Sequence, residues 1–118
     1  MAYDQHLADR IAQELQAQGI NAEAKRLMGG LCFVLNEKMC VGTSIDKASN
    51  KPKLIARIGA RAVDTALADK NCLPFQPAGR VMRDFISVLD EGIDSDEGLS
   101  HWIRLSVDFN HKLDEKKT

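Results

Sequence analysis

The spacing of apolar residues changes from about four to two within the first part of this sequence. Leu7, Ile11 and Leu15 recur at every fourth position with polar residues between them, as in a helix that buries one side. From Leu31 to Leu35 the side chains instead alternate, as in a β-strand. The sequence therefore predicts a helix that leads into a sheet.

The first helix is predicted over about residues 4–18. Asp4 is placed to accept a hydrogen bond from the first-turn amides, and Gly19 suits the left-handed residue that ends a helix. Residues 63–67 predict a second, short helix, which Asn71 and Pro74 stop.

The last helix is predicted to start at Asp94 or Ser95, either of which can cap it. Acidic residues in its first turn suit the positive end of the helix dipole. Residues 114–118 are expected to fray. The residues that follow helical spacing along this last helix are Leu99, Trp102, Ile103, Ser106, Phe109 and Leu113.

The first predicted strand is apolar on both sides. Leu31, Phe33 and Leu35 lie on one side, and Cys32 and Val34 lie on the other. Such a strand is typical of a central position with both faces covered. We therefore expect helices or a second subunit on each face.

Asn36 and Glu37 are predicted to form a two-residue turn, because Asn tolerates a positive φ. The expected pairs are then Leu35 with Lys38, Phe33 with Cys40, and Cys32 with Val41. Since adjacent residues point to opposite faces, Cys32 and Cys40 would share neither a disulfide nor a metal ion. A β-bulge would change this register.

Two further strands are predicted over residues 54–59 and 81–89, on either side of the short helix. The inward residues expected in the second are Met82, Phe85 or Ile86, and Val88. Short connections between strands favour an antiparallel sheet. The predicted fold is α+β, one domain over residues 1–118 with about five strands and three helices in the order α-β-β-β-α-β-β-α.

The composition is that of a soluble globular domain. The 118 residues are 44% hydrophobic and 28% charged, with a net charge of −1, so neither nucleic acid nor a membrane is required as a partner. The charged amino terminus does not resemble a secretory signal, and we expect a cytoplasmic protein. Cys32, Cys40 and Cys72 lack the spacing of a disulfide framework, which favours free thiols.

No arrangement of residues in the sequence predicts catalysis, and we expect no enzyme, no cofactor and no metal. His6, His101 and His111 match no ligand spacing and are interpreted as exposed histidines on helices. The acidic residues 90–98 lack the order of an EF-hand loop and are interpreted as a helix cap.

Four glycines are interpreted as turn positions: Gly29, Gly30, Gly42 and Gly79. A phosphate-binding loop at Gly29 and Gly30 is the weaker alternative, because neither a helix nor a G-K-[ST] sequence follows them.

A candidate polar site lies at Gly59, where Arg57 and Arg61 flank a strand-to-helix turn whose amides could bind an anion. A tight connection with solvated arginines is the alternative. Packing alone does not require a guanidinium at Arg57 or Arg80, so each is predicted to form an internal ion pair or a partner contact. The basic residues that could share one surface are Lys25, Arg26, Lys51, Lys53, Arg57, Arg61, Arg80 and Arg83.

Four segments carry a family resemblance: "KRLMGGLCFVLNEKMCVG", "LIARIG", "AGRVMRDFISV" and "LSHWIRLSVDFNHKL". In this order and spacing they resemble the amino-terminal domain of the TfoX/Sxy competence regulators. The resemblance covers about residues 23–113 of this chain, and the predicted amino-terminal helix in residues 1–22 precedes it. Family members usually have Phe at Met28, Asn-Gly at residues 36–37 and Pro at Val81.

The resemblance implies an α+β domain with an antiparallel sheet, similar to secretion-chaperone-like folds, in bacterial cytoplasm. It implies no reaction. The full-length regulators control natural transformation and carry a second, helical domain, whereas we expect this chain to be a stand-alone domain. The leading hypothesis is a non-enzymatic regulatory or protein-interaction module with an unknown protein partner, and a candidate homodimer. The alternatives are a direct nucleic-acid-binding regulator and a small anion- or nucleotide-binding protein.

Overall fold

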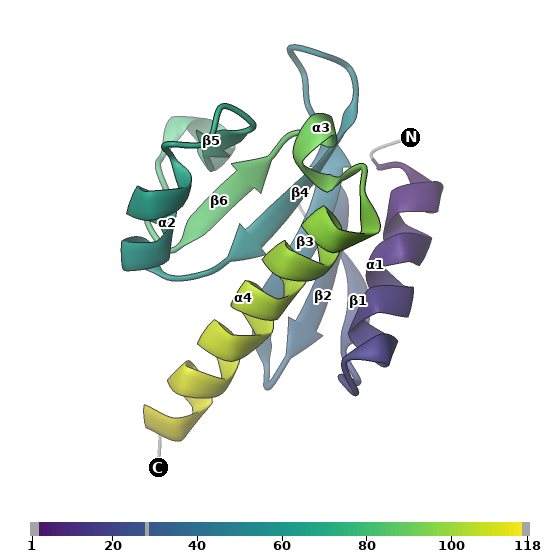
Figure 1. Cartoon of the computed structure of the whole chain (residues 1–118), viewed down its shortest axis with the longest axis vertical. Helices are drawn as coiled ribbons and strands as arrows, with labels where there is room; N and C mark the ends of the chain where they lie inside the picture. Colours follow the sequence, from purple (N-terminus) through teal and green to yellow (C-terminus); the bar gives the residue numbers. More distant parts are fainter. Residues whose placement is uncertain (1–2, 28, 117–118) are drawn as a thin grey trace.

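The computed structural model describes residues 3–27 and 29–116, which form one α+β domain (Figure 1). In this part of the chain, six antiparallel strands form one sheet in the order β1-β2-β3-β4-β6-β5. The predicted fold class is confirmed, with one strand more than expected. The elements are α1 (Gln5–Ala17), β1 (Glu23–Leu27), β2 (Gly30–Leu35), β3 (Lys38–Ile45), β4 (Pro52–Arg57), α2 (Ala60–Ala66), β5 (Cys72–Pro74), the 3-10 turn η1 (Pro77–Gly79), β6 (Phe85–Val88), α3 (Asp90–Ile93) and α4 (Asp96–Lys116).

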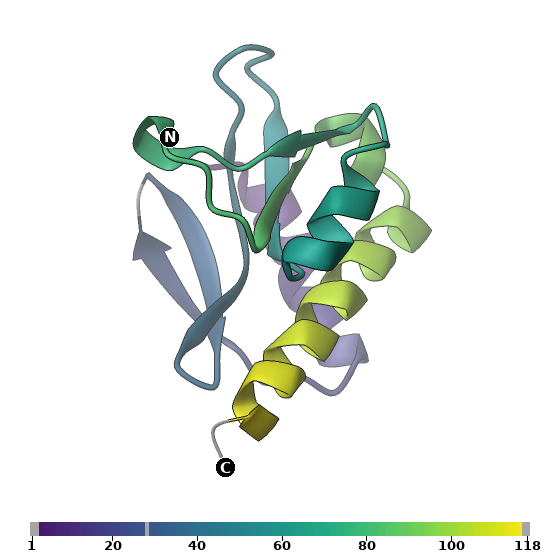
Figure 2. The ribbon, with the colours of Figure 1, turned by 90° about the vertical axis from the view of Figure 1, so that its left-hand side faces the viewer.

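The helices α1 and α4 pack against each other and cover one face of the sheet, which we call the helix face (Figures 1 and 2). The core between these layers includes Leu7, Ile11, Leu15, Phe33, Val41, Leu54, Ile86, Val88, Leu99, Trp102 and Ile103. The opposite face, which we call the open face, has no described α-helix on it, although the segment between β5 and β6 reaches across to it (Figure 2). Helices therefore cover one face as predicted, and cover of the open face by a second subunit stays a prediction.

Helix α1 lies within one residue of its predicted ends. Asp4 occupies the N-cap position, but its side chain makes no capping hydrogen bond, which corrects the role that we predicted for it. At the other end Gly19 has φ +75°, and the Ile20 amide donates to the Leu15 carbonyl at 2.9 Å. This is the geometry of a glycine-terminated helix.

The strand β1 precedes the point where we expected the sheet to begin. Its residues 23–26 are all exposed, because β1 lies at the edge of the sheet. A strand without a buried side shows no apolar alternation, so its spacing carried no strand signal. As a result β2 is second from the edge and not central.

The hairpin between β2 and β3 has the predicted two-residue turn. Asn36 and Glu37 have φ +54° and +66°, and Leu35 pairs with Lys38. Positive φ at both residues is typical of a type I′ turn, whose twist matches that of the strands.

A β-bulge follows the first pairs of this hairpin, so the predicted register beyond it is wrong. The register shifts between Phe33 and Val34, and Phe33 pairs with Val41 and Cys32 with Gly42. The extra residue lets Cys40 and Val41 both reach the core on the helix face. Cys32 lies on the open face, so the two cysteines do point away from each other as predicted.

The second half of the sheet differs from the prediction at both of its strands. Phe85, Ile86 and Val88 are buried in β6 as expected, but Met82 is 39% exposed. The Phe85 amide donates to the Met82 carbonyl at 3.1 Å, so Met82 lies in a turn before the strand. β5 is a three-residue edge strand and one of the two strands that the predicted order places after the second helix, although no residues were assigned to it.

Helix α4 begins where a serine caps it. The Gly98 amide donates to the Ser95 Oγ at 3.0 Å, as one of the two predicted caps requires. The acidic segment before it also forms α3, a separate four-residue helix. α4 is helical as far as Lys116, and the fraying of residues 114–118 stays a prediction, with 117 and 118 outside the described residues. No helix in the described ranges has the length and apolar composition needed to cross a bilayer.

Candidate functional site

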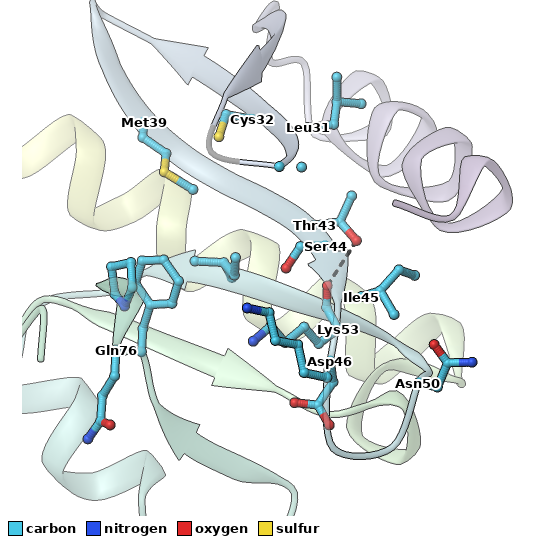
Figure 3. A pocket seen from close by; sticks show the side chains of 16 residues that line it. Leu31, Cys32, Met39, Thr43, Ser44, Ile45, Asp46, Asn50, Lys53 and Gln76 are labelled. Carbon is cyan, nitrogen blue, oxygen red and sulfur yellow. Dashed lines mark hydrogen bonds between the residues drawn. The ribbon is translucent and has the colours of Figure 1, made fainter. Parts of the chain in front are cut away.

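The open face carries a cleft of about 800 Å³ between β2, β3 and β4 and the segment that follows β5 (Figure 3). Its volume falls within the range of about 300–1,000 Å³ that is usual for ligand pockets. The lining residues include Cys32, Met39, Ser44, Asp46, Lys47, Lys53, Ile55, Phe75 and Gln76. The cleft can therefore receive a ligand or a segment of another protein.

One end of the cleft is polar and positively charged. Lys47 and Lys53 both line it, and neither forms a salt bridge with any described residue. Asp46 lies beside Lys53 (Figure 3). The Ser49 hydroxyl donates to the Asp46 carboxylate at 2.9 Å, and this bond, the Ser49 amide and the charge of Lys53 hold the pKa of Asp46 below its ordinary value. The bonds from Ser49 thus hold the β3–β4 loop in shape, and this end of the cleft carries two ammonium groups and one carboxylate.

The other end of the cleft is apolar. The Met39 side chain lies over Gly42, where a Cβ would come within 2.7 Å of the Met39 Cε. The Met39 methyl group could move aside, but the same Cβ would also lie 3.1 Å from the Leu31 carbonyl oxygen. Gly42 lies in the middle of β3 and not in a turn, which corrects its interpretation from the sequence. The Phe75 ring packs on Phe85 with their centroids 5.6 Å apart. This end offers a thioether and an aromatic ring to an apolar group.

The remaining predicted turn glycines lie near strand or turn ends. Gly29 has φ +75° between β1 and β2, and Gly79 has φ +79° at the end of η1. Gly30 instead begins β2 without a positive φ, and a Cβ on it would approach the Ser44 Cβ at 3.1 Å. Gly30 thus allows the close approach of β2 and β3 beside the cleft.

The three cysteines are buried free thiols. Burial raises the pKa of Cys40 to about 12. Burial, with a smaller contribution from the charge of Asp69, raises the pKa of Cys72 to about 11. Burial also raises the pKa of Cys32, which lines the cleft. Because the thiolate is the nucleophile, a raised pKa makes each thiol less reactive.

We expect iodoacetamide at pH 8 to alkylate all three cysteines of the native protein at least about a hundredfold more slowly than in urea, since few thiolates form and access is blocked. Mass spectrometry of the labelled peptides measures each rate. Labelling of Cys40 at the same rate with and without urea would contradict the burial of this thiol in the core.

Arg57 forms the internal ion pair that was one of its two predicted roles. Its Nη2 lies 3.4 Å from the Asp84 Oδ2. The guanidinium also lies 5.5 Å from the ring centroid of Phe85 and 5.9 Å from that of Phe109. Because the pair is partly exposed, the ion pair itself contributes little stability, and the aromatic contacts hold the side chain in place.

The other residues of the predicted polar site form no ion pair with any residue that the structure describes. The Gly59 amide already donates to the Asp84 carbonyl at 3.0 Å, so it is not available to an anion. Arg61 and Arg80 are exposed, and neither side chain forms a hydrogen bond or ion pair with the described residues. A contact of these arginines with an anion or a partner stays a prediction.

A second, smaller groove of about 160 Å³ lies between α2 and the turn before β6. It includes three of the most exposed large apolar residues, Leu67, Val81 and Met82, whose exposed fractions are 39%, 50% and 39%. Single exposed apolar residues are common on protein surfaces, and this shallow groove offers few polar groups to orient a ligand. The open-face cleft is the stronger candidate.

The histidines lie where the sequence predicted, on exposed positions of α1 and α4: His6, His101 and His111. Across residues 3–27 and 29–116, no group of three or more His, Cys, Asp or Glu side chains is placed to hold a metal ion.

The sequence interpretation missed the cleft as a site. Lys53 was noted only as one of eight basic residues that could share a surface. Lys53 and Ile55 are two positions apart in β4 and so lie on the same face of the sheet. This spacing was the sequence signal that could have indicated part of the cleft. That Phe75 lines the same cleft depends on the path of the chain after β5, which no local pattern shows.

Comparison with protein families matches residues 14–110 to the TfoX N-terminal domain. Comparisons with curated proteins and with solved structures gave no match. The matched range runs from the second half of α1 to the last turns of α4 and contains the whole sheet. This chain therefore belongs to the TfoX N-terminal domain family.

Proposed function

We propose that this protein is a non-enzymatic protein-interaction module with a regulatory role, and that a segment of a partner protein binds in the open-face cleft. The observation that carries the proposal is that two ammonium groups without a salt bridge among the described residues, Lys47 and Lys53, line the same cleft as the apolar side chains of Met39 and Phe75, with Asp46 as the one carboxylate beside them. A segment with one or two acidic residues beside an apolar side chain fits both ends of the cleft.

The chemistry of the cleft supports binding over catalysis. Its one thiol, Cys32, has a raised pKa and is a poor nucleophile. A methionine suits an interaction surface, because its unbranched side chain adapts to different apolar groups. The family resemblance is to regulators and implies no reaction, which agrees with this proposal.

A tagged copy of the protein tests the proposal when it is used to capture partners from a cell extract. We expect the double variant Lys47→Glu, Lys53→Glu to recover the principal partner at least about tenfold less than the unaltered protein does, because two attractive charges become repulsive. Quantitative mass spectrometry of the captured proteins measures the change, and thermal melting confirms that the variant is folded.

The matched control is Lys70→Glu, Lys112→Glu, which makes the same charge change at exposed positions outside the cleft. Equal loss in both variants would show that only net charge matters and would contradict a site in the cleft. Extracts treated with nuclease separate the alternative function. Capture that disappears after nuclease would favour the nucleic-acid-binding regulator, for which the two cleft lysines are the only specific support in the described part of the chain.

A further inference from the structure

The two edges of the sheet differ in how well they are protected from pairing with another strand. β5 is three residues long and ends in Pro74, both of which are common ways to block an edge. β1 is five residues long, contains no proline, and pairs with β2 without a register shift. The backbone edge at β1 is therefore not closed by short length, by proline or by a bulge, and its charged side chains admit only a strand whose charges match them.

The hairpin register shows which backbone groups of β1 point outward. Leu27 and Gly30 pair across a connection of two residues, and residues that flank such a connection exchange hydrogen bonds with each other. Hydrogen-bonded pairs recur at every second residue, so Lys25 bonds to β2 and the amides and carbonyls of Ala24 and Arg26 point away from it. Ala24 and Arg26 thus offer donors and acceptors at the edge.

The side chains of β1 carry opposite charges on the open face. Glu23 pairs with Val34 and Lys25 with Cys32, which lines the open-face cleft, so both charged residues lie on that face. Both side chains are exposed, and neither forms an ion pair with a described residue. In an antiparallel pair of two β1 strands the order is reversed, so that Glu23 of one strand can face Lys25 of the other.

We propose that two copies of this chain join through β1, antiparallel, with the two-fold axis at Ala24. In two antiparallel copies of one strand, side chains of the open face pair with side chains of the open face only if the two-fold axis lies between a residue and its own copy. When the axis lies at Ala24, the outward backbone groups of the two Ala24 residues bond to each other. Each Glu23 then lies opposite Lys25 of the second copy. The two sheets become one continuous sheet.

The alternative register is disfavoured by charge. Shifting the axis by one residue to Lys25 keeps the outward backbone groups facing each other, but it places the two Lys25 side chains directly opposite each other. Like charges at a cross-strand pair are destabilising. Ala24 is exposed, and its small side chain on the helix face leaves room for the second copy at the axis.

Sedimentation equilibrium from micromolar to millimolar protein tests the dimer. We expect Lys25→Glu alone, or Glu23→Lys alone, to raise the dimer dissociation constant about tenfold, since two attractive pairs become repulsive. An equimolar mixture of these two variants is expected to dimerise again, because every cross-strand pair in the mixed dimer is of opposite charge. Lys70→Glu, which reverses an exposed charge elsewhere, is expected to leave the constant unchanged.

Amide hydrogen exchange reports the register independently. In the dimer the Ala24 amide gains protection as the protein concentration rises, whereas the Lys25 amide, bonded to β2, is protected at all concentrations. A single-chain mass at millimolar protein, or a dimer that neither Lys25→Glu nor Glu23→Lys weakens, would overturn the proposal. None of these outcomes depends on whether a partner protein binds in the cleft.

Discussion

Replacing Gly59 with alanine is expected to lower the free energy of unfolding by about 3 kcal/mol. Gly59 has φ +93° and ψ 148°, a conformation that is nearly restricted to glycine. A Cβ at this position would also lie 2.6 Å from Cε1 of Phe109, a half-buried residue of α4 that packs on the β4–α2 turn. Backbone strain and a steric clash therefore add. Urea unfolding followed by circular dichroism measures the loss.

Gly79→Ala separates the two contributions. Gly79 also has a positive φ, +79°, but an added Cβ there would meet no atom within 4 Å. This variant introduces strain without a clash, and we expect it to cost about 1 kcal/mol. Combining Gly59→Ala with Phe109→Ala should relieve the clash. The double variant is then expected to lose less free energy of unfolding than the sum of the losses in the two single variants. Equal costs for Gly59→Ala and Gly79→Ala would contradict the contact with Phe109.

Replacing Asn110 with aspartate is expected to destabilise the protein by about 3 kcal/mol at pH 7. Asn110 is 2% exposed and ties α4 to the β2–β3 hairpin. Its Nδ2 donates to the Leu35 carbonyl at 2.9 Å, and its Oδ1 accepts from the Asn36 Nδ2 at 2.9 Å. A carboxylate keeps the second bond but faces the Leu35 carbonyl with no proton to donate. Denaturant unfolding at a series of pH values measures the effect.

The pH dependence of this loss follows from the same geometry. Burial and the facing carbonyl would raise the pKa of the new carboxyl above the unfolded value of about 3.9. Below that unfolded pKa the carboxyl is protonated in both states and can donate to Leu35, so the deficit relative to the unaltered protein is small. The deficit grows as the pH rises toward the folded pKa. Asn50→Asp, in an exposed turn with φ +59°, is the control and should change stability by less than about 0.5 kcal/mol. A deficit at Asn110→Asp that does not change with pH would contradict the role of the donated hydrogen bond.

Local patterns predicted the helices better than the sheet. The spacing of Leu7, Ile11 and Leu15 placed α1, and Ser95 was one of the two caps expected for α4. Each of these signals lies within a few residues of the feature that it predicts. The strand β1 was missed because all four of its residues 23–26 are exposed, and an edge strand is defined by its neighbour and not by its own apolar residues.

The register of the β2–β3 hairpin also could not be predicted from local patterns, and here the error is a single residue. The turn at Asn36 and Glu37 set the first pairs, but the bulge after them moved Phe33 from Cys40 to Val41. A bulge forms where burying both Cys40 and Val41 against the helices is more favourable than an unbroken ladder, and that choice depends on α4, far along the chain.

The sequence by itself determined the α+β class, since helical and alternating spacings and turn residues are local properties, and its match to a family placed the chain among TfoX N-terminal domains. The tertiary structure alone decided which polar groups meet. It placed Arg57 beside Asp84 and near the rings of Phe85 and Phe109, and it brought Lys53 and Phe75 into the lining of one cleft. These contacts join residues that are distant in the chain, and their formation depends on how the whole sheet pairs and twists, which no short stretch of sequence encodes.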